Sequence, residues 1–100
     1  MDRYEVLLSP QASRDLDGIH LYIGRVIQEP EIAKKQADRL WDGILALSHY
    51  PYAHQERLIG QFACKGYRQL LIDRFIVLFR IDEEKKKVLV VTVQFQGRNI

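Results

Sequence analysis

The sequence predicts an α+β fold in a single domain over residues 1–100: an N-terminal strand, an antiparallel helix hairpin and a three-stranded antiparallel meander. The length of 100 residues and the apolar content of 47% fit one ordinary globular domain with its own core. Along the chain, apolar residues recur first at every second position, then at every third or fourth position, and finally at every second position again. Two turn-like segments divide the last third of the chain into three strand-like runs. Together these observations predict the order β-α-α-β-β-β.

The first strand and the first helix are separated by a cap signal. Residues 3–9 alternate in polarity, with Tyr4, Val6 and Leu8 on one face, which predicts a strand. Ser9 and Pro10 follow, a capping residue and a proline suited to the first helical position. From residue 12 the apolar side chains recur every three or four positions, which predicts a long amphipathic helix. Its buried stripe is expected to contain Leu16, Ile19, Ile23 and Ile27.

The second helix starts after an interruption at residues 28–31, where Pro30 breaks the first pattern. It is expected to continue until residues 48–51 end it. Because the link between the helices is short, they are expected to fold back as an antiparallel hairpin. Leu40 and Trp41 are expected to pack on the inner face of the first helix. The full stripe is predicted to contain Ala33, Ala37, Leu40, Trp41, Ile44 and Leu47.

Residues 52–66 show no period and are predicted to form a loop, long enough to suggest a functional role or partial disorder. Three strands are then predicted at Tyr67–Ile72, Phe75–Asp82 and residues 88–95, joined by two tight turns. The last two runs are apolar on both faces, as expected of central strands. The N-terminal strand is expected to join this sheet either at the edge or beside the last strand.

Composition and spacing exclude several classes of site. The apolar runs are too short for a signal peptide or a membrane helix, so a soluble, cytoplasmic protein without membrane association is expected. A single cysteine, Cys64, allows no intramolecular disulfide and is expected to be half-buried and structural. His20, His49 and His54 lack metal-ligand spacing, so neither a metal nor another cofactor is expected. Only His54, in the loop, stays open as a functional histidine.

Charge is distributed unequally along the chain. Residues 1–50 contain six Lys/Arg and eight Asp/Glu, whereas residues 51–100 contain nine and five. The lysine run at 85–87 follows three acidic residues and is interpreted as a solvated turn. Four arginines on or beside the predicted sheet are candidates for gripping phosphate or carboxylate, with surface ion pairing as the alternative. They are Arg68, Arg74, Arg80 and Arg98.

The ordered set of segments resembles the RelE/ParE superfamily, the toxins of bacterial type II toxin–antitoxin systems. The resemblance extends over essentially the whole chain. The matching segments are residues 9–12, Leu16, residues 19–23, residues 47–51, residues 67–68 and residues 80–82. It implies a growth-inhibiting, plasmid-stabilising toxin that is neutralised by a cognate antitoxin, as a dimer or a toxin–antitoxin hetero-oligomer.

Two activities occur in that superfamily: ribosome-dependent cleavage of messenger RNA by RelE-like members and poisoning of DNA gyrase by ParE-like members. RelE-like enzymes resemble each other in an arginine at the start of the middle sheet strand, where this chain has Ile76. They also end in a tyrosine, histidine or arginine group, where this chain has residues 96–100 with Arg98 alone. The chain is therefore expected to be closer to the ParE-like branch, with no catalytic residues.

Three functions stay open at this stage. The first is a toxin that binds a target such as DNA gyrase, through Arg68, Arg80 and Arg98. The second is a ribosome-dependent ribonuclease acting on mRNA, with Glu56, Arg74 and Arg98 as catalytic residues. The third is a decayed member that only binds its antitoxin. In each case the apolar content leaves side chains for a partner, and the antitoxin is expected to contact Tyr22 and Val26.

Overall fold

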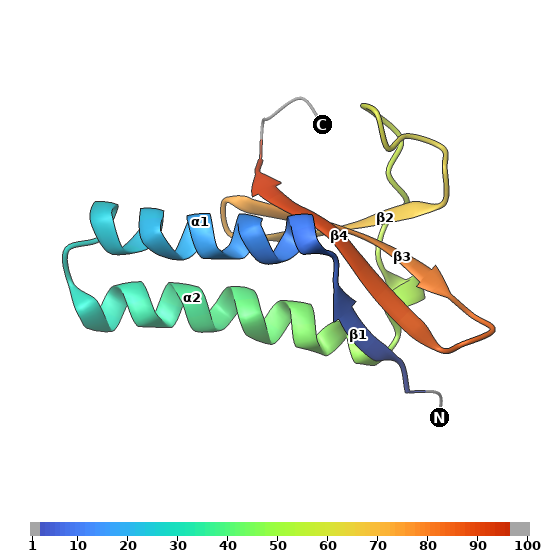
Figure 1. Cartoon of the computed structure of the whole chain (residues 1–100), viewed down its shortest axis with the longest axis horizontal. Helices are drawn as coiled ribbons and strands as arrows, with labels where there is room; N and C mark the ends of the chain where they lie inside the picture. The colour runs from blue at the N-terminus through green and yellow to red at the C-terminus, as the bar shows by residue number, and fades with distance from the viewer. Residues whose placement is uncertain (1–2, 97–100) are drawn as a thin grey trace.

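The computed structural model describes residues 3–96 and confirms the predicted order of elements (Figure 1). The helices and strands are β1 (Glu5–Leu8), α1 (Pro10–Val26), α2 (Pro30–Leu45), β2 (Tyr67–Ile72), β3 (Phe75–Asp82) and β4 (Lys87–Phe95). Two short 3-10 turns, η1 (Ala46–Ser48) and η2 (Pro51–Ala53), follow α2. Both tight turns of the meander are also present, between β2 and β3 and between β3 and β4.

The four strands form one mixed sheet in the order β1-β4-β3-β2. β1 is parallel to β4, from Glu5 opposite Lys87 to Leu8 opposite Val90, and the other pairs are antiparallel. The N-terminal strand therefore lies at an edge of the sheet and pairs with the last strand, which fits both placements that the sequence left open. A bulge in β4 shifts the register between Leu78 and Phe79 of β3.

The core lies between one face of the sheet and the helix hairpin. Phe75, Val77 and Phe79 of β3 belong to it, so the alternating Ile76 and Leu78 face away from the helices. The helices extend beyond the sheet at the end where they are joined (Figure 1). The two helices, the turn η1 and β4 add Leu16, Ile19, Ile23, Leu40, Ile44, Leu47, Val88, Val90 and Val93.

Ser9 caps α1 as predicted and also ties it to the sheet. Its hydroxyl oxygen accepts a hydrogen bond from the Ala12 N–H at 3.0 Å and donates one to the Val91 carbonyl at 2.8 Å. Asp15, one turn later, accepts from the backbone N–H of Val93 at 3.1 Å, beside the bulge. These contacts fix the direction in which α1 leaves β1 and crosses β4.

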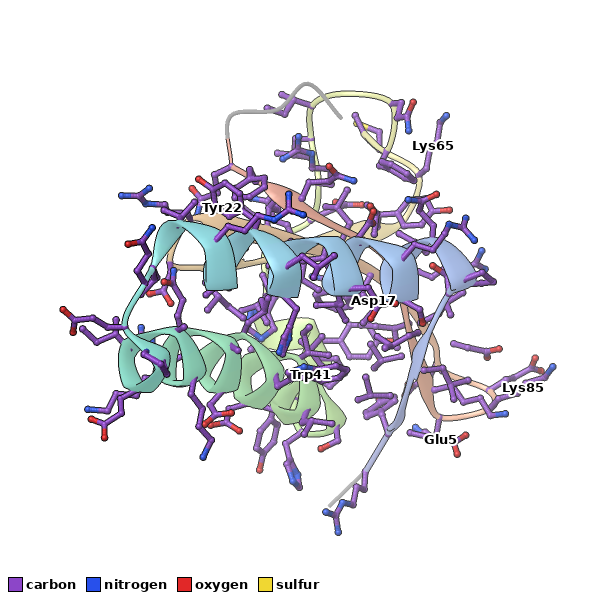
Figure 2. The ribbon with its side chains drawn as sticks, turned by 60° about the vertical axis from the view of Figure 1, so that its left-hand side comes forward. Glu5, Asp17, Tyr22, Trp41, Lys65 and Lys85 are labelled. Atoms are coloured by element: carbon purple, nitrogen blue, oxygen red, sulfur yellow. The ribbon has the colours of Figure 1, made fainter. Side chains whose placement is uncertain are left out.

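Two burial predictions need correction. Trp41 lies beside Leu16 and Ile19 of α1, as predicted, but it is not buried: it stands at the margin of the α2 stripe, over the seam between the helices, and is 37% exposed. Figure 2 shows Trp41 on α2. Cys64 is exposed, because it lies in the loop before β2, which adds no residue to the core; its backbone there is left-handed (φ 56°). Side chains of this loop are therefore not covered by the core between the helices and the sheet.

The charged turn between β3 and β4 is stabilised by ion pairs at the protein surface. The Lys86 ammonium lies 2.6 Å from the Glu83 carboxylate, and Lys87 lies 3.6 Å from Glu5, so the lysine run forms the solvated turn that was predicted. Within residues 3–96, no helix combines the length and apolarity needed to cross a membrane. In the same part of the chain, no group of three or more His, Cys, Asp or Glu side chains is arranged to hold a metal ion.

Candidate functional site

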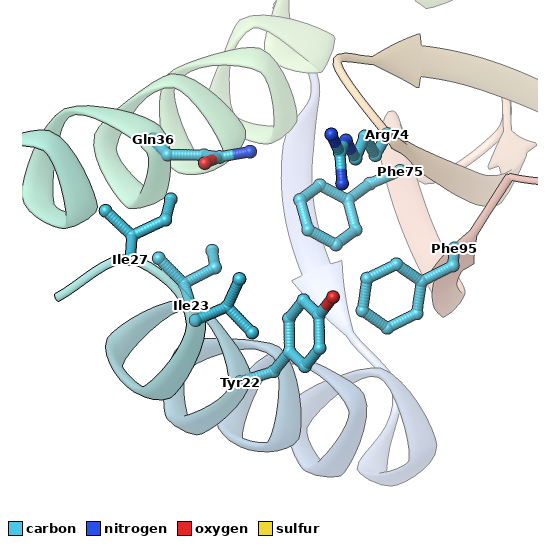
Figure 3. A pocket seen from close by; sticks show the side chains of 8 residues that line it. Tyr22, Ile23, Ile27, Gln36, Arg74, Phe75 and Phe95 are labelled. Carbon is cyan, nitrogen blue, oxygen red and sulfur yellow. The ribbon is translucent and has the colours of Figure 1, made fainter.

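A cavity of about 250 Å³ opens at the joined end of the helix hairpin, where α1 and α2 extend past the sheet (Figure 3). Its walls come from α1 and the link after it, from α2, and from the turn and strand ends of the meander. The lining residues are Tyr22, Ile23, Val26, Ile27, Gln36, Arg74, Phe75 and Phe95. Elements far apart in the sequence therefore build one apolar pocket.

Three aromatic rings in mutual contact form one wall of this cavity. The Tyr22 ring meets the Phe95 ring edge-to-face, with centroids 4.9 Å apart, and Phe95 lies 5.0 Å from Phe75. Phe75 and Phe95 are opposite each other in the β3–β4 register, so strand pairing holds them together. Tyr22 and Val26 remain exposed at the rim. The wall can thus accept a further apolar side chain without rearranging the core.

Arg74 is the only charged side chain among the described residues that line the cavity. It follows Asp73 in the two-residue turn between β2 and β3, where Asp73 adopts a left-handed conformation (φ 52°). The Asp73 carboxylate binds Arg39 of α2 at 2.9 and 3.0 Å, which raises the pKa of that guanidinium through the hydrogen bond and the charge. The neighbouring carboxylate is therefore engaged by another arginine, and Arg74 keeps its positive charge available to a ligand.

Gln96 fixes this turn from the end of β4. Its N–H donates to the Arg74 carbonyl at 2.7 Å, and its side-chain amide donates to the Asp73 carbonyl at 2.9 Å. The turn that presents Arg74 is therefore held on both sides. A pocket lined mainly by apolar side chains, with one cation carried on a turn whose backbone is held, suits a peptide that carries apolar side chains next to a carboxylate.

The structure brings together residues that sequence reasoning had assigned to different roles. Tyr22 and Val26, expected at an antitoxin interface, share this cavity with Arg74, which was expected to grip phosphate or carboxylate and to belong to the alternative catalytic set. Phe95 was not foreseen as a wall of a pocket, because its place beside Tyr22 depends on how α1 crosses the sheet. The one signal for this wall in the sequence was the pair of aromatic residues, Phe75 and Phe95, at the ends of two neighbouring predicted strands.

The predicted target-binding arginines do not form one patch. Arg68 is opposite Phe79 in the register and lies on the helix-covered face, where its guanidinium donates to the His54 carbonyl at 2.8 Å. The same guanidinium lies 5.2 Å from the centre of the Tyr52 ring. Arg80 is opposite Tyr67 on the other face of the sheet and is exposed. Arg98 lies outside the described residues.

The residues of the expected ribonuclease set are also separated. Glu56 pairs with Arg68 in an isolated antiparallel bridge at the start of β2, whereas Arg74 follows the end of that strand. Because a strand rises about 3.3 Å per residue, their backbones lie more than about 13 Å apart. Ile76 is buried on the face away from the helices, with Leu71 and Gln94 opposite it in the register. At this position the sheet presents apolar and amide side chains where a phosphate would need a cation.

His54, the one histidine left open, has a structural environment. Its ring packs edge-to-face on Phe79, with centroids 5.9 Å apart, and its carbonyl accepts the hydrogen bond from Arg68. Burial, and secondarily the charge of Arg68, lowers the pKa of His54 below its usual value. The imidazole is therefore held neutral near pH 7 and supports the packing of η2 on the sheet.

Comparisons with known proteins agree with this fold. Residues 6–100 match the family described as the ParE toxin of type II toxin–antitoxin systems, parDE. The chain is similar to a structure of the chromosomal ParDE system from P. aeruginosa, with 20% identity, a TM-score of 0.73, and 93% of this chain and 96% of that chain covered. It is also similar to the RelBE2 toxin–antitoxin complex from Mycobacterium tuberculosis, with 23% identity, a TM-score of 0.67, and 98% and 97% covered. No curated protein sequence gives a significant match.

Proposed function

The chain belongs to the family of ParE toxins of type II toxin–antitoxin systems, and we propose that it arrests growth by binding a target protein such as DNA gyrase and is neutralised by a cognate antitoxin. Gyrase is the target that the resemblance to ParE-like toxins implies. The proposal has two parts, the antitoxin surface and the mode of action, and each has its own structural support.

The cavity at the joined end of the helix hairpin supports an antitoxin partner. A segment that folds on binding can place an apolar side chain against Tyr22, Val26 and Phe95. A carboxylate next to that side chain would reach Arg74, whose own neighbour Asp73 is bound to Arg39. The excess of basic residues in the second half of the chain favours an acidic segment, since complementary charges steer association.

The side chains on the sheet face around Ile76 are the main observation that favours target binding over RNA cleavage as the mode of action. RNA cleavage through the 2′-hydroxyl needs a base, an acid and a cation on the phosphate. Ile76 is buried and apolar, and Glu56 and Arg74 stand at opposite ends of β2. Each missing transition-state donor typically costs ~10²–10³ in rate, so this arrangement supports little or no cleavage.

The antitoxin part is tested by co-expressing the chain with the product of the adjacent reading frame. The unaltered chain should co-purify with that product and lose its toxicity. Val26→Asp should weaken the complex roughly tenfold or more, because it places a charge against the aromatic wall. Leu21→Asp is the matched control, because Leu21 is an exposed neighbour on α1 outside the cavity wall.

An unaltered complex with Val26→Asp would show that the antitoxin binds elsewhere. Antitoxin binding without any growth arrest by the free chain would identify a decayed toxin.

A further inference from the structure

The loop before β2 is organised by a buried arginine. Arg57 is 7% exposed, although it carries a charge. Its Nε donates to the Ile59 carbonyl at 2.9 Å, and its Nη1 donates to the Gln69 side-chain oxygen at 2.9 Å. Burying a guanidinium is costly unless such partners compensate, so this position is specifically built.

The same residue closes the loop through its backbone. Its N–H donates to the Tyr67 carbonyl at 2.7 Å, and its carbonyl accepts from the Cys64 N–H at 3.0 Å. Residues 57–64 therefore form a closed loop whose ends meet at the edge of β2. Inside it, Ala63 N–H donates to the Gly60 carbonyl at 3.1 Å, and Gly60 supplies a positive φ of 81°.

This closed loop presents two adjacent aliphatic side chains to solvent. Leu58 is 59% exposed and Ile59 is 68% exposed, so neither is held by the core. At the base of the loop, the Phe62 ring packs on the Tyr67 ring with centroids 5.0 Å apart. The hydrogen bonds of Arg57 and the Phe62–Tyr67 contact thus hold the loop in place, while the Leu58 and Ile59 side chains are exposed to solvent.

Two basic residues, Lys65 and Arg80, lie on this loop and on the strand beside its base. Tyr67, which supports the loop, is opposite Arg80 in the register, so exposed Arg80 lies on the same sheet face as the base of the loop. Arg80 forms no ion pair within the described part of the chain. Figure 2 shows Lys65 on the same loop, away from the helix hairpin. Because the Cys64 N–H bonds to the Arg57 carbonyl, Lys65 and Leu58 flank the same closure of the loop. The loop that carries Leu58 and Ile59 therefore shares this end of the sheet with two basic residues, Lys65 and Arg80.

We propose that Leu58 and Ile59, the apolar knob, insert into an apolar cleft with an acidic rim on the target protein. The inference rests on the proposed function, because it names the surface through which the toxin binds its target. A preformed loop loses little conformational entropy on binding, and a small apolar anchor surrounded by a polar rim is the usual form of a protein hot spot.

A protein partner fits these side chains better than a nucleic acid or a membrane does. Single-stranded nucleic acids are bound by stacking on aromatic rings, whereas the knob is aliphatic. Two aliphatic side chains also bury far less area than a membrane-binding amphipathic helix does. The knob stands at the start of β2 and the Arg74 cavity at its end, so the antitoxin part of the proposal uses a different surface.

The test measures the affinity of the purified full-length chain for purified DNA gyrase and, in parallel, growth arrest after induction. The double variant Leu58→Ser/Ile59→Ser should bind gyrase roughly tenfold or more weakly and should lose growth arrest at equal expression. Leu21→Ser is the matched control, since Leu21 is 64% exposed on α1. It should keep gyrase affinity and growth arrest within about twofold, as expected for a residue outside the interface.

A second variant tests the organising role of the arginine. Arg57→Lys keeps the charge and the knob but cannot make the two directed bonds to Ile59 and Gln69. It should weaken gyrase binding while Leu58 and Ile59 are intact, with faster amide exchange confined to residues 57–64.

Each part of the proposal fails in a different way. Gyrase affinity and growth arrest unchanged in the double variant would overturn the knob and leave the proposed function standing. Antitoxin binding lost with the knob, or knob-dependent binding to anionic lipid vesicles, would assign these side chains to another partner and would also overturn it. Absence of both gyrase binding and growth arrest in the unaltered chain would overturn the proposed function itself.

Discussion

Replacing Leu40 by alanine tests the packing of the helix hairpin on the sheet. Leu40 is 3% exposed in the centre of α2 and belongs to the core with Leu16 and Ile19. Removing its three terminal carbons costs the transfer free energy and leaves a cavity, together about 2–5 kcal/mol. For a domain with about 5–15 kcal/mol of total stability, this is a large fraction. Leu45→Ala provides the comparison, because Leu45 ends the same helix at 56% exposure.

Urea denaturation followed by circular dichroism measures both variants. Leu40→Ala should lower the midpoint strongly with an unchanged slope, whereas Leu45→Ala should cost less than about 1 kcal/mol. Equal losses in the two variants, or a loss below about 0.5 kcal/mol for Leu40→Ala, would refute the assignment of the buried helix face.

Three further predictions concern the cap of α1, the loop histidine and the mode of action. Ser9→Ala should cost about 0.5–2 kcal/mol in urea denaturation, because the cap of α1 and the bond to Val91 are both lost; no measurable loss would contradict the capping role. Burial lowers the pKa of folded His54 below 6.5, so the unfolded chain binds the proton first and stability falls as pH drops below about 6.5. His54→Phe should flatten that fall in thermal midpoints measured between pH 7.5 and 5, and an unchanged profile would exclude this cause. Glu56→Gln should leave growth arrest unchanged while Arg80→Ala weakens it, in induction assays at equal expression; the reverse order would favour catalysis.

Most of the fold was predictable because its signals are local. Ser9 and Pro10 start α1 and Pro30 starts α2. Alternating polarity marks β1, and apolar runs between turn-like segments mark the strands of the meander within a residue or two. The error at Trp41 has a physical cause. The stripe of α2 is wide, and the sequence could not show which margin lies over the sheet and which over the seam with α1.

The candidate sites were predictable only in part, because they depend on contacts between distant segments. Exposed Tyr22 and Val26 followed from amphipathic spacing, but the meeting of Tyr22 with Phe95 and Arg74 requires the crossing of α1 over the sheet. The organised loop gave no local signal. In the sequence Arg57 cannot be told from a surface arginine. Only the structure shows its hydrogen bonds to the Ile59 carbonyl and to Gln69.

The order in which cellular processes stop after induction tests the central claim most directly. DNA synthesis and protein synthesis would be followed by labelled precursors in the same culture, with mRNA on translating ribosomes mapped by primer extension. A toxin that binds gyrase should stop DNA synthesis first and leave that mRNA intact. Early arrest of translation, with cleavage at defined codon positions that Glu56→Gln or Arg74→Ala abolishes, would contradict the proposal and establish the ribonuclease instead.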